Sequence, residues 1–448
     1  MGQNSSTLGG YTKFTDVSGG GGDGRIPASL QAVGSGVPAR RSNFVPARVV
    51  GWAKSAGNGF TVHGCFPSPR PFTHVQLMYE GLSAATGITA KVAPSAIRGN
   101  GYSPKTSAGA DVTPSDATFG TTDPNDFTNP GGGSATGSIS AGSGLEVNAD
   151  IVNGRLFSDI LPVASLDRSD GGSNWLLMVR SYSAGALPAA SQATMNPATT
   201  DASGSIQTIE PDWAGGVQSG DFVTTNFGTY APAETWISPA AVRFLIDREL
   251  VFVATYADST GAGWSGATDA VQGGGVQGYA RRAVRSLQSK GQPVIHYNRA
   301  KEGSKTASFL GNALREIPNT RPSIAFLRSW SINDGISQAI LDAAFNLLLQ
   351  VLATCRRYNT VPVVEVPPPQ GLSAANDLLR VAYCQRVRNI GCPTLDLDAI
   401  LTNGAVPAAI RPDLKAADGS VVHPNGVGHN VIAVTAEQLI VQLAGLQN

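Results

Sequence analysis

The sequence has few cysteines and few charged residues for its length. Its 448 residues contain four cysteines, and Asp, Glu, Lys and Arg together make up 14% of the chain. Cys65, Cys355, Cys384 and Cys392 show neither the CxxC spacing of a zinc or redox site nor the density of a disulfide-stabilised protein. The five histidines include no HExxH motif. The sequence therefore predicts neither a metal centre nor a disulfide framework.

The chain also lacks an excess of charge of one sign. Lys and Arg total 32, as do Asp and Glu, so no overall field attracts nucleic acid or an anionic membrane. The opening "MGQNSSTLGG" has neither the basic nor the apolar region of a secretory signal, and the most apolar run, residues 339–355, carries Asp342 and is too short to span a bilayer. We expect no nucleic-acid partner, no signal peptide and no membrane-spanning segment.

The chain divides into three regions that differ in composition and in hydrophobic pattern. Residues 1–44 are rich in Gly and Ser and predict a flexible N-terminal arm. Residues 45–245 contain short pieces of alternating apolar residues, such as "FTHVQLMYEGL", between Gly, Pro, Asn and Asp turns. This pattern is typical of an antiparallel β-sandwich or jelly roll, which we expect as an accessory domain.

Residues 246–448 alternate between strand and helix patterns. Five runs are rich in β-forming residues: "LVFVAT", "PVIHYN", "SIAFLRSW", "VPVVEV" and "TLDLDAI". The sequence predicts helices between and after these runs, near residues 276–289, 305–316, 335–357, 372–389 and 428–445. Such alternation predicts an α/β domain with a five-stranded parallel sheet covered by helices on both faces.

Polar clusters follow several of these runs. They are Ala257-Asp258-Ser259, "KEGSKT" at 301–306, "SIND" at 331–334 and "HPNGVGH" at 423–429. In open α/β sheets, functional groups collect at the carboxyl ends of the strands. We therefore expect the four clusters to meet in one site.

In this order, the four clusters resemble the conserved blocks of the SGNH hydrolases, also called the GDSL esterase/lipase family. The resemblance covers about residues 246–448 and implies a flavodoxin-like three-layer α/β/α fold. It implies Ser259 as the nucleophile and His423, directly before Pro-Asn, as the base. The oxyanion hole would be formed by the N–H groups of Ser259 and Gly303 and by the side-chain amide of Asn333.

The chemistry of these residue types supports the same roles. A serine hydroxyl is a poor nucleophile until a base removes its proton, and histidine titrates in the suitable range. Glycine lets the backbone approach a ligand closely, and the asparagine amide donates a hydrogen bond without carrying charge. Taken one by one, each residue also has a structural interpretation, with Ser259 as a helix N-cap and His423 as a surface loop residue.

The sequence departs from the family pattern at three positions. Ala257 and Ser331 replace glycines, which is tolerable if neither position needs a positive φ. The family usually has an aspartate three residues before the histidine, where this chain has Ser420. We favour Asp418 as the acid that orients His423, with a Ser–His pair assisted by a backbone carbonyl, or Asp413, as alternatives.

Two further interpretations concern neighbouring motifs. His429 competes with His423 as the base, but it leads directly into an apolar-periodic stretch that predicts a helix. "GGGVQG" at 273–278 fits the G-x-G-x-x-G pattern of a nucleotide-binding domain, with Glu302 downstream. Its glycines lie too far beyond Thr255 to hold a pyrophosphate against the strand end.

Together, these observations predict a serine esterase that works through an acyl-enzyme and needs no metal or organic cofactor. The resemblance and the added β-domain lead us to expect O-deacetylation of a polysaccharide, with an acylated carbohydrate as substrate. The N-terminal arm and β-domain also look like those of bacteriophage tail-associated deacetylases, which implies docking to the particle through residues 1–44 and a virion-associated or extracellular location. The sequence is compatible with an oligomer and does not define the oligomeric state. The alternative is a catalytically decayed hydrolase that serves as a glycan-binding or structural tail protein.

Overall fold

The computed structural model divides the chain into two compact units. One comprises Met1–Arg41, Val251–Gln272 and Gln277–Asn448, and the other Ser42–Leu250 and Gly273–Val276. The residues that the structure describes are 7–8, 11–12, 39, 42–48, 52–68, 70–80, 85–96, 104–120, 133–139, 155–167, 175–191, 214–219, 221, 236–237, 239, 241–263, 278–301, 303–416 and 421–446. The arm predicted for residues 1–44 therefore lies largely outside the described residues.

The unit that begins at Ser42 is built from antiparallel strands. One sheet has the order β11-β4-β10-β6-β7, in which β12 also pairs with β10 and β8 with β6. Its strands are β4 (Trp52–Ser68), β6 (Ala85–Ser95), β7 (Ser115–Asp116), β8 (Gly137–Ile139), β10 (Trp175–Ser191), β11 (Ala214–Ser219) and β12 (Trp236–Ile237). A second group pairs β5 (Phe72–Glu80) with β9 (Arg155–Phe157). The strands are antiparallel, as the alternating pattern predicts, and their arrangement as a sandwich stays a prediction.

Among the described residues, the other unit has five parallel strands in the order β14-β13-β15-β16-β17, and β13 enters this unit at Val251. They are β13 (Ala241–Tyr256), β14 (Val294–Asn298), β15 (Ile324–Arg328), β16 (Val361–Val366) and β17 (Thr394–Asp396). The strands β14 and β15 lie on opposite sides of β13, so the order in which the chain adds strands to the sheet reverses at β13. Such a switch point is where α/β sheets form their sites.

The strand β13 is longer than the sequence pattern indicates. We predicted a strand at "LVFVAT", from Leu250, whereas β13 begins at Ala241. Its first part pairs antiparallel with β5 and with β3 (Ser42–Arg48), and its last part pairs parallel with β14 and β15. The sheet is therefore mixed and not wholly parallel.

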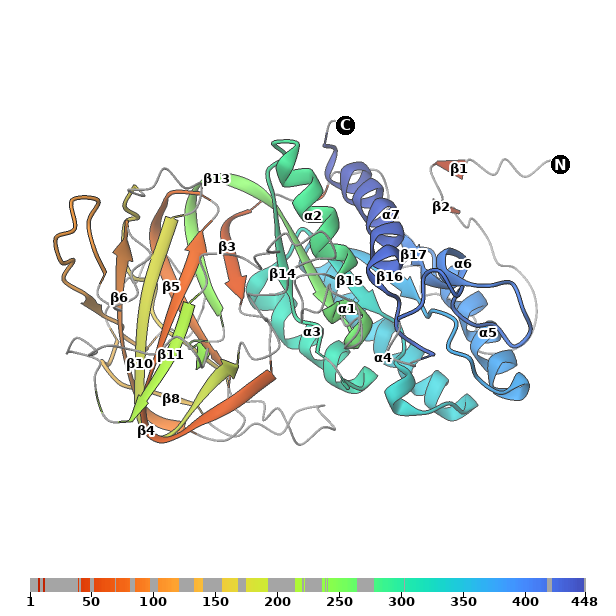
Figure 1. Cartoon of the computed structure of the whole chain (residues 1–448), viewed down its shortest axis with the longest axis horizontal. Helices are drawn as coiled ribbons and strands as arrows, with labels where there is room; N and C mark the ends of the chain where they lie inside the picture. Colours follow the sequence, from red (N-terminus) through yellow and green to blue (C-terminus); the bar gives the residue numbers. More distant parts are fainter. Residues whose placement is uncertain are drawn as a thin grey trace. The chain divides into compact units, whose positions relative to one another are not determined.

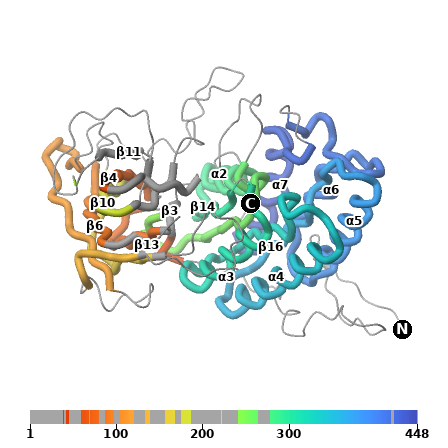
Figure 2. The backbone as a smooth tube through the Cα atoms, turned by 90° about the horizontal axis from the view of Figure 1, so that it is seen from below, coloured from red at the N-terminus to blue at the C-terminus, as the bar shows by residue number. Residues whose placement is uncertain are grey.

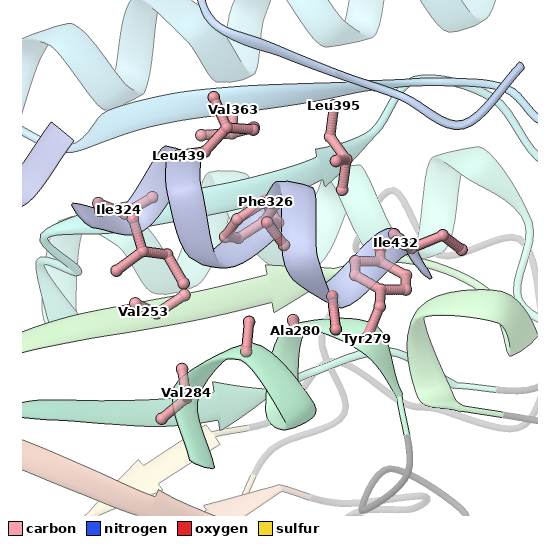
Figure 3. Close-up of a cluster of buried hydrophobic side chains, with 14 of the residues drawn as sticks. Val253, Tyr279, Ala280, Val284, Ile324, Phe326, Val363, Leu395, Ile432 and Leu439 are labelled. Atoms are coloured by element: carbon pink, nitrogen blue, oxygen red, sulfur yellow. The ribbon is translucent and has the colours of Figure 1, made fainter. Parts of the chain in front are cut away.

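Helices lie on both faces of the parallel strands. Figure 2 shows α2 (Tyr279–Ser289) and α7 (Gly426–Ala444) on one side of β14 and β16, and α3 (Thr306–Thr320) and α4 (Gln338–Arg357) on the other. The helix α5 (Ala374–Arg388) connects β16 to β17. Val253, Phe326 and Val363 of the strands form one buried cluster with α2 and α7 (Figure 3). This apolar layer fixes both helices over the sheet.

The helix α4 is long and apolar enough to cross a membrane by length and composition alone. Leu341, Leu348 and Leu352 on this helix are buried, and its Asp342 accepts a hydrogen bond from Arg386 of α5. This is the pattern of a core helix that packs on its own protein.

The last predicted strand, "TLDLDAI", is only partly a strand. The strand β17 ends at Asp396, whose side chain accepts a hydrogen bond from the N–H of Ala399 and caps α6 (Leu397–Leu401). Aspartate is a favoured N-cap residue, so the prediction overlooked a helix start within an apolar run.

Candidate active site

Ser259 lies at the carboxyl end of β13, at the start of the short helix α1 (Ser259–Ala262) (Figure 1). Asp258 is the N-cap, because its side chain accepts the N–H of Thr260 at 3.2 Å. Ser259 is thus the first helical residue and not the cap. Its N–H belongs to the first turn, where helix geometry supplies no intrahelical acceptor.

Small residues allow this turn to form. A Cβ on Gly261 would lie 2.4 Å from the Cβ of Ala257 and 3.2 Å from that of Ala300, and the buried Ala257, Ala262 and Ala300 cluster together. The helix ends at Gly263, which has a φ of 84°. The turn that carries Ser259 is therefore closely packed.

His423 is held by a short pairing between two segments. The N–H of Ala416 donates to the carbonyl of His423 at 2.9 Å, and the N–H of Asn425 donates to the carbonyl of Leu414 at 2.7 Å. The side chain of Asn425 then caps α7 by accepting the N–H of Gly428 at 2.9 Å. His423 therefore lies immediately before a helix, on a backbone fixed from both sides.

The structure brings the predicted nucleophile and base together. The Oγ atom of Ser259 and the Nε2 atom of His423 are 2.9 Å apart, which is hydrogen-bonding distance. Ser259 is 8% exposed, and His423 is half-buried. The pair is therefore largely, but not completely, shielded from water.

Gly303 lies in the loop before α3 and Asn333 in a short 3-10 helix, Ile332–Asp334, and these two segments contact each other. The side-chain amide of Asn333 donates to the carbonyl of Ser304, the neighbour of Gly303, at 3.0 Å. Asp334 accepts hydrogen bonds from the N–H and the hydroxyl of Thr306. Gly303 has a φ of 68°, which L side chains rarely adopt, and a Cβ there would contact nothing within 4 Å. Glycine is thus favoured at this position by its conformation and not by a steric contact.

Neither Ala257 nor Ser331, the two positions where the sequence pattern led us to expect glycine, has a strained backbone. Ser331 has φ −116° and ψ 141°, which is extended backbone. Among the described non-glycine residues, positive φ occurs at Arg321 and Asn359. Ala257 and Ser331 therefore occupy conformations that any residue adopts.

The remaining predicted residues stand apart from the Ser–His pair or lie outside the described residues. Asp418 falls in residues 417–420, which the structure does not describe. Both carboxylate oxygens of Asp413 accept hydrogen bonds from Arg411. His429 is fully buried in α7, where its ring stacks on Tyr279.

The nucleotide-binding motif is placed only in part. Of "GGGVQG" the structure describes Gly278, the N-cap of α2, and it does not describe Glu302. Across the described ranges, no three His, Cys, Asp or Glu side chains are grouped so that they could hold a metal ion.

Sequence reasoning missed a set of buried charges directly behind Ser259. Arg328 at the end of β15 forms ion pairs with Glu365 of β16 and with Asp258. The hydroxyl of Tyr279 donates to Glu365. The available signal was a charged residue inside each of two runs that otherwise predict fully buried strands, because a buried charge requires a partner.

The comparisons with known proteins show low sequence identity and low structural similarity. No family model and no curated protein matches the chain. Among solved structures, an acetyl xylan esterase is 18% identical over 42% of this chain and 99% of its own, with a TM-score of 0.34. A carbohydrate acetylesterase family member from Sinorhizobium meliloti is 12% identical over 44% of this chain and 100% of its own, also at 0.34. A GDSL-like lipase from Bacteroides thetaiotaomicron is 13% identical over 42% of this chain and 87% of its own, at 0.31. At these values the likeness carries no weight for function.

Proposed function

We propose that the protein is a serine hydrolase that cleaves carboxylic esters through an acyl-enzyme. The observation that supports this most directly is the 2.9 Å contact between the Ser259 hydroxyl and Nε2 of His423. Such a pair at the carboxyl end of a central parallel strand is the arrangement that activates a serine nucleophile.

The reaction proceeds in two balanced steps. His423 accepts the hydroxyl proton while the Ser259 Oγ atom attacks the ester carbonyl, and the tetrahedral intermediate then expels the alcohol, which takes the proton from His423. Water, deprotonated by His423, attacks the acyl-serine, and the carboxylic acid leaves as Ser259 regains its proton. The N–H groups of Ser259 and Gly303 and the amide of Asn333 stabilise the oxyanion in both steps.

The test compares the native protein with Ser259→Ala. We expect the native protein to hydrolyse p-nitrophenyl acetate and to be labelled by a fluorophosphonate, and the variant to lose hydrolysis by about 10⁴-fold or more and labelling altogether. Ser289→Ala, which changes an exposed serine at the end of α2, is the control and should behave like the native protein. Equal activity in the native protein and Ser259→Ala would refute the proposal.

Asp418 is our proposal for the third member of the triad. It would hold the imidazole in the tautomer that accepts a proton at Nε2. Asp418→Asn should reduce kcat by roughly 100-fold or more while KM changes little. Asp413→Asn is the matched control, because Asp413 is already paired with Arg411. A native kcat in Asp418→Asn would favour a Ser–His pair assisted by a backbone carbonyl.

For the substrate, we propose an O-acetylated polysaccharide, on the basis of the sequence resemblance. A panel of acetylated glycans, assayed for acetate release by the native protein and by Ser259→Ala, tests this.

Docking to a phage particle through residues 1–44 is a separate proposal. A protein lacking those residues should keep its esterase activity and lose incorporation into the particle. Glycan binding without acetate release would instead favour the decayed hydrolase.

A further inference from the structure

A buried charged layer lies on the sheet face that α2 and α7 cover. Phe326 and Val363 belong to the apolar cluster on that face (Figure 3). Because side chains alternate along a strand, Arg328 and Glu365, two residues further on, point to the same face. Their side chains are 1% and 0% exposed. On this face of the sheet, the apolar side chains are therefore followed by charged side chains toward the carboxyl ends of the strands, where Ser259 lies.

The charged groups form a connected set. The Nε atom of Arg328 is 2.9 Å from Oε2 of Glu365, and its Nη2 atom is 3.6 Å from Oδ1 of Asp258. The Tyr279 hydroxyl donates to the other oxygen of Glu365. Arg328 is therefore held on one side by Glu365, which Tyr279 fixes in turn, and faces Asp258 on the other.

Electrostatics keep Arg328 charged in this position. Burial lowers the pKa of Arg328, but the nearby Asp258 and Glu365 carboxylates outweigh burial and raise that pKa above its ordinary value. Burial raises the pKa of Glu365 despite the opposing effect of Arg328. Since a buried ion pair contributes little net stability compared with apolar packing, these groups need another explanation than stability alone.

The set contacts the turn that carries the nucleophile. Oδ1 of Asp258 accepts the N–H of Thr260 and lies 3.6 Å from Nη2 of Arg328, as an ion pair without a hydrogen bond. The carbonyl of Asp258 accepts the N–H of Ala262. Asp258 thereby determines where the first turn of α1 begins. A shift of its carboxylate would move Ser259, the next residue.

The set also contacts the helix that follows the base. The ring of Tyr279 stacks on that of His429, with centroids 6.2 Å apart and an interplanar angle of 13°. The N–H of His429 donates to the carbonyl of Asn425, two residues after His423. One buried cluster therefore touches both segments whose relative position sets the Ser–His distance.

We infer that Arg328 is a positioning residue for the esterase reaction: with Glu365 and Tyr279 it fixes Asp258 and, through Asp258, the Ser259 hydroxyl against His423. The inference rests on the proposed function. Arg328 is 1% exposed and Asp258 is 5% exposed, and the role we assign to both is to hold the turn rather than to bind the substrate. Their contribution is to the geometry of attack, where a displacement of about 1 Å can cost on the order of 100-fold in rate.

The decisive variant is Asp258→Asn, which retains an oxygen to cap α1 and removes the charge that faces Arg328. We expect kcat for p-nitrophenyl acetate and the rate constant of fluorophosphonate labelling to fall together by roughly 10- to 100-fold. KM should stay within about twofold, since substrate contacts are unchanged. Arg328→Met should show at least the same loss, and Arg328→Lys should recover part of it.

Controls separate positioning from folding and from the proposed function. Arg380 is equally buried and pairs with Asp377 and Asp398, so Arg380→Met measures the cost of breaking a buried ion pair elsewhere in the same unit. The folded fraction of the Arg380→Met protein should react with the fluorophosphonate with the same rate constant as the native protein. The inference is overturned if Asp258→Asn labels at the native rate, or if its loss of kcat only follows a loss of folded protein by circular dichroism. If Ser259→Ala is as active as the native protein, the proposed function itself fails.

Discussion

The Oγ atom of Ser259 lies 2.9 Å from Nε2 of His423, although 164 residues separate the two in the chain. Each atom is positioned by a different local structure. Asp258 caps the turn of Ser259, and the pairing of residues 414–416 with 423–425 holds His423. The contact should therefore be sensitive to changes in either structure, even where no reacting atom is altered.

Replacing the base should abolish activation of the serine. His423→Ala should reduce ester hydrolysis and fluorophosphonate labelling by about 10³-fold or more, because the imidazole of His423 is the group at hydrogen-bonding distance from the Ser259 hydroxyl among the described residues. The control is His74→Ala, which changes a histidine outside the site whose ring contacts Thr73. Labelling of His423→Ala at the native rate would assign the base to another residue.

Removing Asn333, the side-chain donor that we propose for the oxyanion hole, should slow the chemical step. Asn333→Ala should lower kcat by about 100-fold and leave KM nearly unchanged, because the donor acts on charge that develops in the transition state. Asn319→Ala is the matched control, since the Asn319 amide also donates to a backbone carbonyl, that of Arg315. A rise in KM with native kcat would mean that Asn333 binds substrate without stabilising the oxyanion.

A methyl group on Gly428 should disturb the segment that carries the base. A Cβ there would lie 2.7 Å from the carbonyl oxygen of Leu414 and 2.8 Å from the Cβ of Pro424, which follows His423 directly. Gly428→Ala should cost about 1–3 kcal/mol of stability and lower kcat by about tenfold or more. Gly185→Ala, with no atom closer than 3.8 Å, should be neutral in thermal melts and assays. Equal behaviour of the two variants would exclude this steric effect.

A buried histidine should make stability fall in mild acid. Burial, with a smaller contribution from Arg281, lowers the pKa of His296 to about 3. Below pH 6.5 the unfolded chain therefore binds a proton that the folded protein does not, so the free energy of unfolding falls as pH decreases toward 3. From pH 7 to pH 5 this group should account for about 2 kcal/mol.

The measurement is urea unfolding at both pH values. His296→Gln keeps a group that can hydrogen-bond to Thr255, which contacts Nε2 of His296 at 2.9 Å. The variant should lose that part of the pH dependence. His63, whose pKa burial also lowers, leaves a remaining slope in both proteins. Identical slopes for native protein and variant would show that His296 does not titrate in this way.

The sequence predicted those features that depend on local patterns. The helices were placed within a few residues of α2, α3, α4, α5 and α7, because apolar periodicity and capping residues mark them. The contact between Ser259 and His423 was also expected, because the four polar clusters, in their order along the chain, predict one common site. Both predictions used signals contained in short stretches.

Features that depend on which strands or side chains pair with each other could not be predicted from local sequence patterns. The run from Ala241 to Ile246 is apolar apart from Arg243 and fits a helix or a strand, and its pairing with β5 and β3 makes it the first part of β13. Likewise, the pairing of Arg328 with Glu365 requires the knowledge that β15 and β16 are neighbours. Strand order is a property of the whole chain, so local patterns indicate a buried charge without indicating its partner.

The continuity of β13 limits how this protein can be shortened. The boundary between the two compact units falls between Leu250 and Val251, which are adjacent buried residues of one hydrogen-bonded strand. A fragment that starts at Val251 would begin inside its central strand, and one that starts at Ala241 would expose a strand edge that normally pairs with β5 and β3, which favours aggregation. Evolution or engineering could exchange the unit that begins at Ser42 only by supplying a replacement that also completes this strand.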